Sequence, residues 1–212
     1  MRHHSQWGRE RLKRVIEEFA CVPRWTILED NVPKRLPSWR RSSSLYLFTH
    51  AFRDASPVCC GDSGAAIPLY LLPISQQARE DAYFWSNHYR DHDNVWLGSG
   101  TLEVLAYRET ADPKSELSSE GRESCREIEA ATGKPTFYYL QRYWGRTVGE
   151  EKRLCPLCGR KWRTSTKETD KTPFWEFTFR CMQCRLVSHV ACSYDNERHA
   201  AIGEYPQKRH SK

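Results

Sequence analysis

The chain has 212 residues, of which 39% are apolar, and it carries a formal net charge of +6. Its 8 Trp, 10 Tyr and 8 Phe provide bulky core material, which argues for a folded protein and against a disordered one. Residues 1–8 lack the apolar core of a signal peptide, and no run approaches the roughly 18 apolar residues of a membrane helix. The odd count of 9 cysteines fits a reducing compartment, so we expect a cytoplasmic protein without a membrane partner.

The positive charge is concentrated at the two ends of the sequence. Residues 1–40 carry a net charge of +4, residues 41–148 carry −3 and residues 149–212 carry +5. If the protein binds a polyanion, the contacts therefore belong to the ends. The alternative is that the excess charge only keeps a small protein soluble, and a value of +6 does not exclude it.

Residues 1–44 predict an N-terminal helix and a linker. Over residues 5–20, apolar side chains recur on one stripe at helical spacing, and the charged side chains fall largely elsewhere. Residues 23–44 contain several prolines and a run of arginine and serine at 40–44, a composition that is typical of a loop.

Residues 45–148 predict a domain of strands and helices. Short apolar runs bounded by Gly and Pro indicate strands, whereas helical spacing, with Ser75 and Gly133 as caps, indicates two helices. The order β-β-α-β-α-β favours an α+β fold with a mixed sheet. The expected strands cover 45–49, 67–72, 101–107 and 136–140, and the expected helices cover 76–90 and 118–132.

The most specific motif consists of two Cys-x-x-Cys pairs near the C-terminus. Cys155 and Cys158 form the first pair, Cys181 and Cys184 form the second, and 22 residues separate them. A two-residue spacer lets both sulfurs of a tight turn lie about 2.3 Å from one metal, and two such turns complete a tetrahedron. The sequence therefore predicts one Zn²⁺ per chain on these four thiolates. Disulfides are the alternative, but they are rare in a reducing compartment, and redox use of the motif lacks its βαβ context.

The segment between the two pairs predicts a β-hairpin. Residues 161–163 leave the first turn, and residues 174–180 return as a strand in which aromatic and polar side chains alternate. With a last strand over 186–191, residues 149–212 predict a zinc ribbon followed by a polar tail. The expected fold is α+β: an N-terminal helix and a mixed α/β domain, followed by a C-terminal β-rich zinc ribbon.

Other residues that could carry chemistry have simpler structural interpretations. Cys59 and Cys60 look like half of a zinc knuckle, but adjacent cysteines cannot easily both bind one zinc, so buried thiols are favoured. His88 and His92 are four residues apart without the glutamate of a zinc-protease helix, which favours a solvated helix end. The sequence contains no nucleophile elbow, Walker loop or Rossmann glycine pattern, and four cysteines leave a metal no open position. We therefore expect no enzyme activity.

Cations are interleaved with aromatic residues in the predicted ribbon. This combination provides phosphate contacts and stacking surfaces for single-stranded nucleic acid. The alternative is that the aromatic side chains form a core around the zinc, and basic ribbons serve equally as protein-docking modules. The other class of function is a protein-binding module, for instance an immunity or antitoxin-like partner that masks another protein, with the acidic region 41–148 as its contact surface. The sequence indicates neither the partner's identity nor the oligomeric state. The candidate nucleic-acid-binding residues are Arg160, Lys161, Trp162, Arg163, Arg180 and Arg185.

Several short motifs point to one family. They are Cys155-Pro156-Leu157-Cys158-Gly159 with Trp162, Phe177-Thr178-Phe179-Arg180-Cys181, Cys184-Arg185-Leu186-Val187-Ser188, Cys60-Gly61-Asp62, and the segments 67–73 and 132–140. Together they resemble an uncharacterised bacterial family of zinc-ribbon-containing proteins for which nucleic-acid binding is conjectured. The resemblance spans about residues 45–190 and implies zinc binding. Ser63 stands where the family is expected to show another cysteine, which argues against a second metal site, and His189 stands at a position that the resemblance implies is not a ligand.

Overall fold

The computed structural model describes residues 6–24, 37–164 and 177–206. The chain divides into two units, residues 1–36 and 37–212. In the first unit, helix α1 (Gln6–Phe19) confirms the predicted N-terminal helix. None of its residues is buried, and Trp7 and Phe19 are 70% and 64% exposed.

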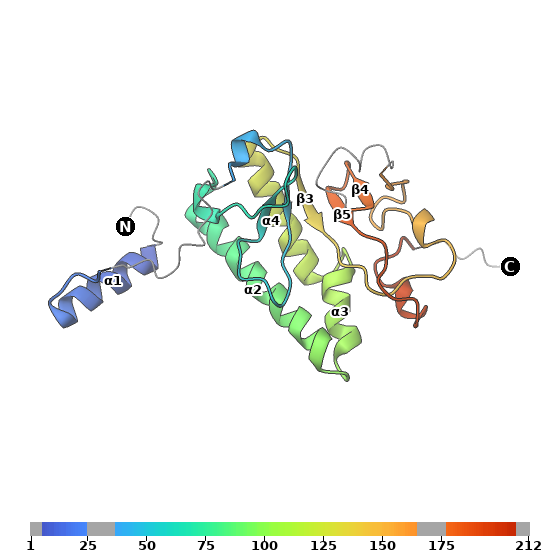
Figure 1. Ribbon diagram of the computed structural model, residues 1–212, viewed down its shortest axis with the longest axis horizontal. Helices are drawn as coiled ribbons and strands as arrows, with labels where there is room; N and C mark the ends of the chain where they lie inside the picture. The colour runs from blue at the N-terminus through green and yellow to red at the C-terminus, as the bar shows by residue number, and fades with distance from the viewer. Residues whose placement is uncertain (1–5, 25–36, 165–176, 207–212) are drawn as a thin grey trace. The chain divides into compact units, whose positions relative to one another are not determined.

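A five-stranded mixed sheet lies at the centre of the second unit (Figure 1). Its strands are β1 (Leu45–Leu47), β2 (Val58–Cys60), β3 (Thr136–Tyr139), β4 (Phe179–Cys181) and β5 (Leu186–Ser188). The strand order is β2-β1-β3-β5-β4, with β1, β3 and β5 parallel and each outer strand antiparallel to its neighbour. The sheet contains strands from both sides of residue 148, so the region that carries the two cysteine pairs shares its sheet with the region before it.

Three helices accompany the sheet, and they are α2 (Gln76–Gly98), α3 (Glu103–Ala111) and α4 (Glu116–Thr132). They pack against one another, and α4 also contacts β1 and β3. Ser75 and Ser115 cap α2 and α4, because each hydroxyl accepts a hydrogen bond from a backbone N–H in the first turn of its helix. Gly133 ends α4 at φ 66°, a left-handed conformation that glycine adopts without strain, as the sequence predicts.

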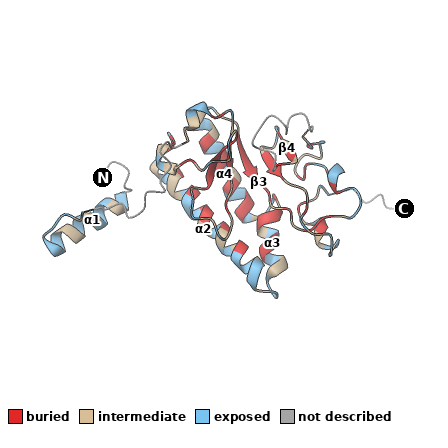
Figure 2. Cartoon of the chain, viewed as in Figure 1, coloured by how far each residue is buried: buried red, intermediate tan, exposed pale blue. Residues whose placement is uncertain are grey.

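Both faces of the sheet bury apolar side chains. On one face, Leu45, Leu47 and Tyr138 share the main core with Trp85 of α2 and Ile128 of α4. Figure 2 shows that the buried residues gather on the strands and on parts of α2, α3 and α4. The other face carries a second, mainly aromatic cluster, which consists of Tyr46, Cys59, Phe137, Tyr139, Phe177 and Val187. Because both faces are apolar, β1 and β3 appear in the sequence as continuous apolar runs.

The structure confirms the predicted strands at 45–49 and 136–140 and both predicted helices, although α2 continues to Gly98. The strand predicted over 101–107 is wrong, because this segment belongs to α3. Its buried residues follow helical spacing and extend beyond the predicted segment: Ala106, Tyr107, Thr110 and Ala111.

The strand predicted over 67–72 is also wrong. It contains a 3₁₀ turn at Leu69–Leu71, and Pro68 has no backbone N–H to donate to a sheet. The chain contributes β2 to the sheet instead, although the sequence predicts no strand at 58–60. Ile67 still donates its N–H to the carbonyl of Val58 at 2.7 Å, so the two segments lie side by side.

A buried arginine holds the segment 197–206 against the rest of the second unit. Arg142 is 1% exposed and forms a two-pronged ion pair with Glu150, with N–O distances of 2.9 and 2.7 Å. Its Nη1 donates to the carbonyls of Ala200 and Ile202 at 2.7 and 3.0 Å. Glu204 completes the network by accepting from Arg142 at 3.1 Å.

Among the described helices, none combines the length and the apolar composition that a membrane span requires.

Candidate metal centre

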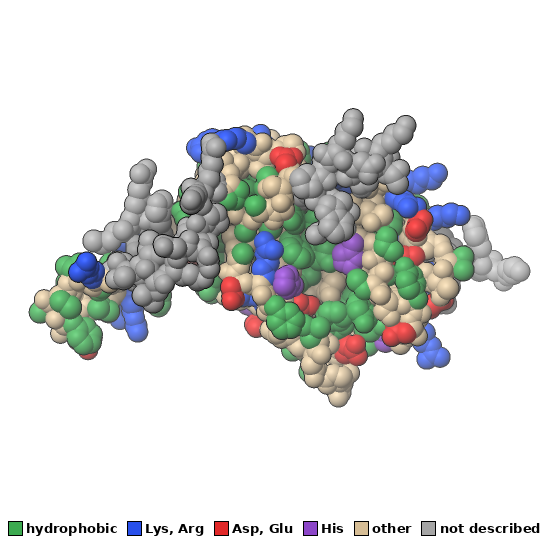
Figure 3. Space-filling model, viewed as in Figure 1, with side chains coloured by type: hydrophobic (Ala, Val, Ile, Leu, Met, Phe, Trp, Pro, Cys, Tyr) green, Lys and Arg blue, Asp and Glu red, His purple; other side chains and the backbone are tan. Residues whose placement is uncertain are grey.

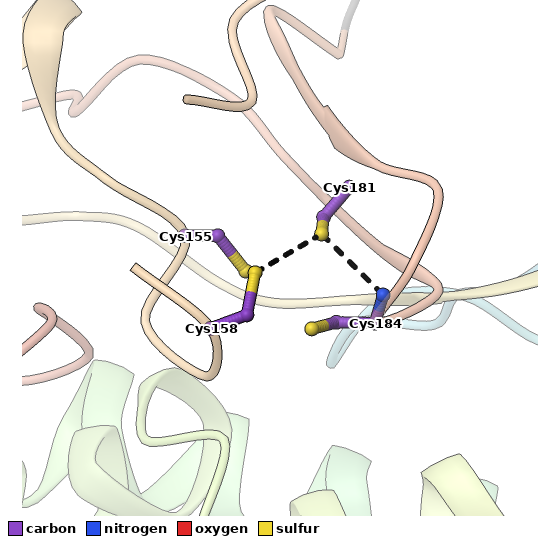
Figure 4. A group of neighbouring side chains, drawn as sticks. All are labelled: Cys155, Cys158, Cys181 and Cys184. Atoms are coloured by element: carbon purple, nitrogen blue, oxygen red, sulfur yellow. Dashed lines mark hydrogen bonds between the residues drawn. The ribbon is translucent and has the colours of Figure 1, made fainter. Parts of the chain in front are cut away.

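Four cysteine side chains converge on one point beside the sheet (Figure 4). The Sγ atoms of Cys155, Cys158, Cys181 and Cys184 all lie within 4.8 Å of one another. The Sγ atoms of Cys158 and Cys181 are 3.7 Å apart, and the N–H of Cys184 donates to the Sγ of Cys181 at 3.4 Å. The structure therefore brings together the four residues that the sequence predicts as ligands, and these four could hold a metal ion.

The first cysteine pair lies on a turn that glycine closes. Gly159 has φ 69°, and its N–H donates to the carbonyl of Cys155 at 2.8 Å. The N–H of Cys155 in turn donates to the carbonyl of Arg160 at 2.9 Å. Glycine pays no steric penalty at this φ, so the Cys-x-x-Cys-Gly sequence accounts for the turn.

The second pair lies at the turn between β4 and β5. Cys181 ends β4 opposite Leu186 of β5, and Arg185 makes the turn with a positive φ of 52°. Backbone hydrogen bonds also join 162–164 to 178–180: Arg180 donates to the carbonyl of Trp162 at 2.6 Å, and Thr164 donates to that of Thr178 at 2.9 Å. The hairpin predicted between the two pairs is therefore present at its base, whereas residues 165–176, with Trp175, lie outside the described residues.

Burial makes these thiols costly to ionise unless a cation is present. It raises the pKa of Cys155 to about 12, and it likewise raises the pKa of Cys184 above its ordinary value. For Cys158, burial also acts to raise the pKa, but hydrogen bonds from the backbone of Arg160 and from neighbouring thiols lower it overall. A divalent cation among the four sulfurs would lower the pKa of these thiols, because a thiol that coordinates a metal is deprotonated.

Trp162 packs into the core next to the cysteine cluster. It is 2% exposed, and its indole N–H donates to the carbonyl of Arg153 at 3.0 Å. The guanidinium of Arg153 lies 4.7 Å from the Trp162 ring centroid and 4.2 Å from that of Phe179. The ring of Trp162 is therefore part of the support of the site and offers no stacking surface to solvent.

The predicted nucleic-acid-binding cations differ in their exposure and in whether they already form an ion pair. Arg160 and Lys161 are exposed and form no ion pair among the described residues, whereas Arg163 pairs with Glu151. Arg185 pairs with Glu129 of α4 at 2.8 Å, and Arg180 is partly buried, with its guanidinium 6.0 Å from the ring centroid of Phe137. Figure 3 shows Lys and Arg side chains projecting from the surface beside β4 and β5.

The structure does not bring the other cysteines and histidines weighed above into a metal cluster within its described part. Cys59 and Cys60 lie on opposite faces of β2, where Cys59 accepts from Arg53 at 3.2 Å and Cys60 accepts from Ser42 at 3.1 Å. His189 shares a 2.6 Å hydrogen bond with the hydroxyl of Tyr139. The residues that sequence reasoning missed are Glu129, whose partner Arg185 is distant in sequence, and Arg153, because a charged residue is rarely expected to be buried.

Comparisons with known proteins place the chain among bacterial relatives. Residues 40–141 match the family model "Domain of unknown function (DUF2310)", and residues 145–194, which contain all four cysteines, match "Domain of unknown function (DUF8594)". Two Haemophilus influenzae proteins, each named "Uncharacterized protein", are 34% identical to it over 160 residues. The match covers 74% of this chain, 74% of the first relative and 58% of the second. No solved structure matches the chain. The relatives agree with the predicted bacterial family, but their names mention neither zinc nor nucleic acid.

Proposed function

The chain belongs to the bacterial family of these Haemophilus influenzae proteins, and we propose that it is a non-catalytic zinc protein with a C-terminal zinc ribbon. The observation that carries the proposal is the convergence of four sulfurs within 4.8 Å of one another. Cys155, Cys158, Cys181 and Cys184 would hold one Zn²⁺ per chain.

The spacing of the sulfurs suits zinc. In a tetrahedron with Zn–S bonds of about 2.3 Å, neighbouring sulfurs lie about 3.8 Å apart. The Cys158–Cys181 distance of 3.7 Å agrees with that value. Four thiolates also complete the coordination of zinc, which leaves no position for a reacting water or substrate. The ion's role in this proposal is structural: it fixes the first cysteine turn to the β4–β5 turn.

The test is elemental analysis of the purified protein. We expect one zinc per chain in the wild-type protein and loss of zinc in Cys181→Ser, because an alcohol is a poor substitute for a thiolate. Cys192→Ser is the matched control, since Cys192 is exposed and lies outside the cluster. Iron in place of zinc, with visible absorbance, would instead indicate an iron–sulfur site, which four tetrahedral thiolates also suit. Full zinc occupancy in Cys181→Ser would contradict the ligand set.

A second candidate function is binding of single-stranded nucleic acid at the ribbon. It is supported by the exposed side chains of Arg160 and Lys161, which form no ion pair with any residue that the structure describes, and by the net charge of +5 over residues 149–212. Phosphate contacts rather than stacking on Trp162 would carry the affinity. A protein partner, bound by the ribbon or by the acidic region 41–148, is the alternative.

Fluorescence anisotropy with a short oligonucleotide at two salt concentrations tests this function. Each neutralised phosphate of a single strand should contribute a slope of about −0.7 in log K against log [salt]. Replacing Arg160 and Lys161 by Ala should therefore flatten the slope by about 1.4. The control is Arg41→Ala, which removes an exposed cation that is distant in sequence from Arg160 and Lys161. Absence of binding at low salt by the zinc-loaded protein would exclude this function and favour the protein partner.

A further inference from the structure

A cavity of about 550 Å³ lies beside the first cysteine turn, between the end of α3 and the segment 198–206. This volume falls within the range of roughly 300–1,000 Å³ that small-molecule sites occupy. None of the metal ligands and none of the nucleic-acid-binding residues predicted from the sequence lines it. Its lining residues are Val104, Arg108, Asp112, Pro113, Lys114, Pro156, Arg198, His199, Ala201, Ile202, Gly203, Glu204 and Pro206.

The cavity has an excess of available positive charge. Arg108, Lys114 and Arg198 are exposed and form no ion pair among the described residues. Of the two carboxylates in the lining, Glu204 is already paired, with Arg142 at 3.1 Å and with Arg146 at 2.8 Å.

The other carboxylate is engaged by the backbone. Asp112 accepts a hydrogen bond from the N–H of Lys114 at 2.9 Å, which fixes the turn after α3. On the opposite wall, His199 keeps its Nδ1 buried without a hydrogen-bond partner among the described residues. Its ring packs edge-on against Trp144, with 4.7 Å between the centroids. Within the part of the chain that the structure describes, the lining thus holds three cations without an ion pair, together with the ring of His199.

Two sets of contacts hold the walls of the cavity close together. A Cβ on Gly203 would lie 2.2 Å from the carbonyl oxygen of Ala111 at the end of α3, so only glycine permits this approach. Gly203 also has φ 72°, which disfavours any other residue. The hydrogen bonds from Arg142 to Ala200 and Ile202 anchor the same wall. These contacts fix the positions of both walls, so binding would require little ordering of the chain.

We propose that this cavity binds the phosphate group of a phosphate ester. The planar guanidinium groups of Arg108 and Arg198 can each donate two hydrogen bonds to phosphate oxygens, and Lys114 adds a third positive charge. Apolar side chains of Val104, Pro113 and Ile202 lie beside them and can contact an attached sugar or base. The phosphate belongs either to a free nucleotide or to a nucleic-acid strand, and the site does not require that the ribbon bind nucleic acid.

The first experiment titrates inorganic phosphate into the zinc-loaded full chain and follows the ¹H–¹⁵N NMR spectrum. Amide shifts should be confined to residues 104–114 and 198–204, and the ring signals of His199 should move with them. The Arg108→Ala/Arg198→Ala double variant should bind phosphate at least about tenfold more weakly, because each lost contact is a charge-assisted hydrogen bond. Arg41→Ala should bind as the wild type does.

Two further titrations identify the source of the phosphate. Tighter binding of adenosine monophosphate than of phosphate would assign a free nucleotide, and tighter binding of a short oligothymidine would assign a strand. Oligothymidine binding that is lost in Arg160→Ala/Lys161→Ala but retained in Arg108→Ala/Arg198→Ala would support the proposed ribbon function. It would also show that the cavity does not bind the strand. Unchanged phosphate affinity in Arg108→Ala/Arg198→Ala, or phosphate-induced shifts outside the cavity lining, would overturn the inference.

Discussion

Arg185, the residue after the last cysteine of the cluster, donates hydrogen bonds to Glu129 of α4 from two of its guanidinium nitrogens. Its Nε lies 2.9 Å from Oε2 and its Nη2 lies 2.8 Å from Oε1 of the carboxylate. The Arg185 hydrogen bond is also the main reason why the pKa of Glu129 lies below its ordinary value. This pair ties the turn that carries Cys181 and Cys184 to a helix of the upstream region, so the candidate metal centre is braced from outside its own hairpin.

Glu129→Gln should weaken that brace. The pair is about one-third exposed on each side, so solvent screens it, and we expect a loss of about 0.5–1 kcal/mol in unfolding free energy. Urea denaturation of the zinc-loaded protein measures the loss, and zinc release to a chelator should become faster. Glu123→Gln is the control, because Glu123 pairs with Arg126 on the exposed surface of the same helix. Equal effects of the two substitutions would show that the brace contributes nothing specific.

Gly121→Ala should destabilise the packing of α4 on the sheet. A Cβ at this position would lie 2.3 Å from the ring of Tyr138 and 2.6 Å from the indole nitrogen of Trp85. Overpacking of this kind costs about 1–3 kcal/mol. At Gly98, the last residue of α2, no atom lies within 4 Å of an added Cβ. Gly98→Ala should therefore be neutral or stabilising by up to about 1 kcal/mol. Thermal and urea unfolding measure the stability of both variants. A Gly121→Ala protein as stable as the wild type would contradict the close packing of Gly121 against Tyr138 and Trp85.

The convergence of the four cysteines could be predicted from the sequence because its information is local. Each Cys-x-x-Cys pair forms its own turn, and Gly159 marks the first of them. The Arg185–Glu129 ion pair was not predictable, since the two residues are far apart in sequence and each has the sequence pattern of an ordinary surface charge. The buried Arg142 is a similar case: its partners Glu150 and Glu204 follow at unrelated spacings, and arginine is rarely expected in a core.

Secondary structure could be predicted where spacing and caps agreed. Ser75 begins one predicted helix and Gly133 ends the other, the apolar spacing of both is clear, and both α2 and α4 are present. The failure over 101–107 came from too short a window, because the helical period of α3 becomes visible only when Thr110 and Ala111 are included. The order of the five strands could not be derived, since it depends on tertiary pairing of β3 with β5, which no local motif encodes.

Removal of the proposed zinc ion should loosen the edge of the sheet that β4 and β5 form. In small zinc sites, binding energy is also folding energy, so chelation should expose the cysteine turns first. Hydrogen exchange should rise most in 155–164 and in 179–188, whereas the amides of α2 should stay protected. Because Leu186 pairs with Tyr138, we expect partial loss of protection in β3 as well. A chelated protein that keeps full protection in β4 and β5 would contradict a structural role for the metal.

Acid should destabilise the protein through Glu150, which lies between two buried arginines. Burial alone would raise the pKa of this carboxyl, but Arg142 and Arg153 lower it below its ordinary value of 4.5. A carboxylate with a depressed pKa stabilises the fold fully above the unfolded-state pKa, and the contribution is lost as the pH falls through the lower, folded-state pKa. The loss attributable to Glu150 should therefore occur below about pH 4.5.

Glu150→Gln isolates this contribution from the other groups that titrate in acid. At neutral pH it leaves Arg142 and Arg153 buried with one fewer negative partner, a change that typically costs about 3–5 kcal/mol. Below about pH 4.5 the difference from the wild type should shrink, because the wild-type carboxyl also becomes neutral. Glu151→Gln, an exposed neighbour that pairs with Arg163, should differ from the wild type by less than about 1 kcal/mol at every pH. Urea unfolding between pH 3 and pH 7 measures all three proteins under the same conditions, so acid release of the metal affects them alike. A constant gap between wild type and Glu150→Gln across that range would mean that Glu150 is not charged in the folded protein.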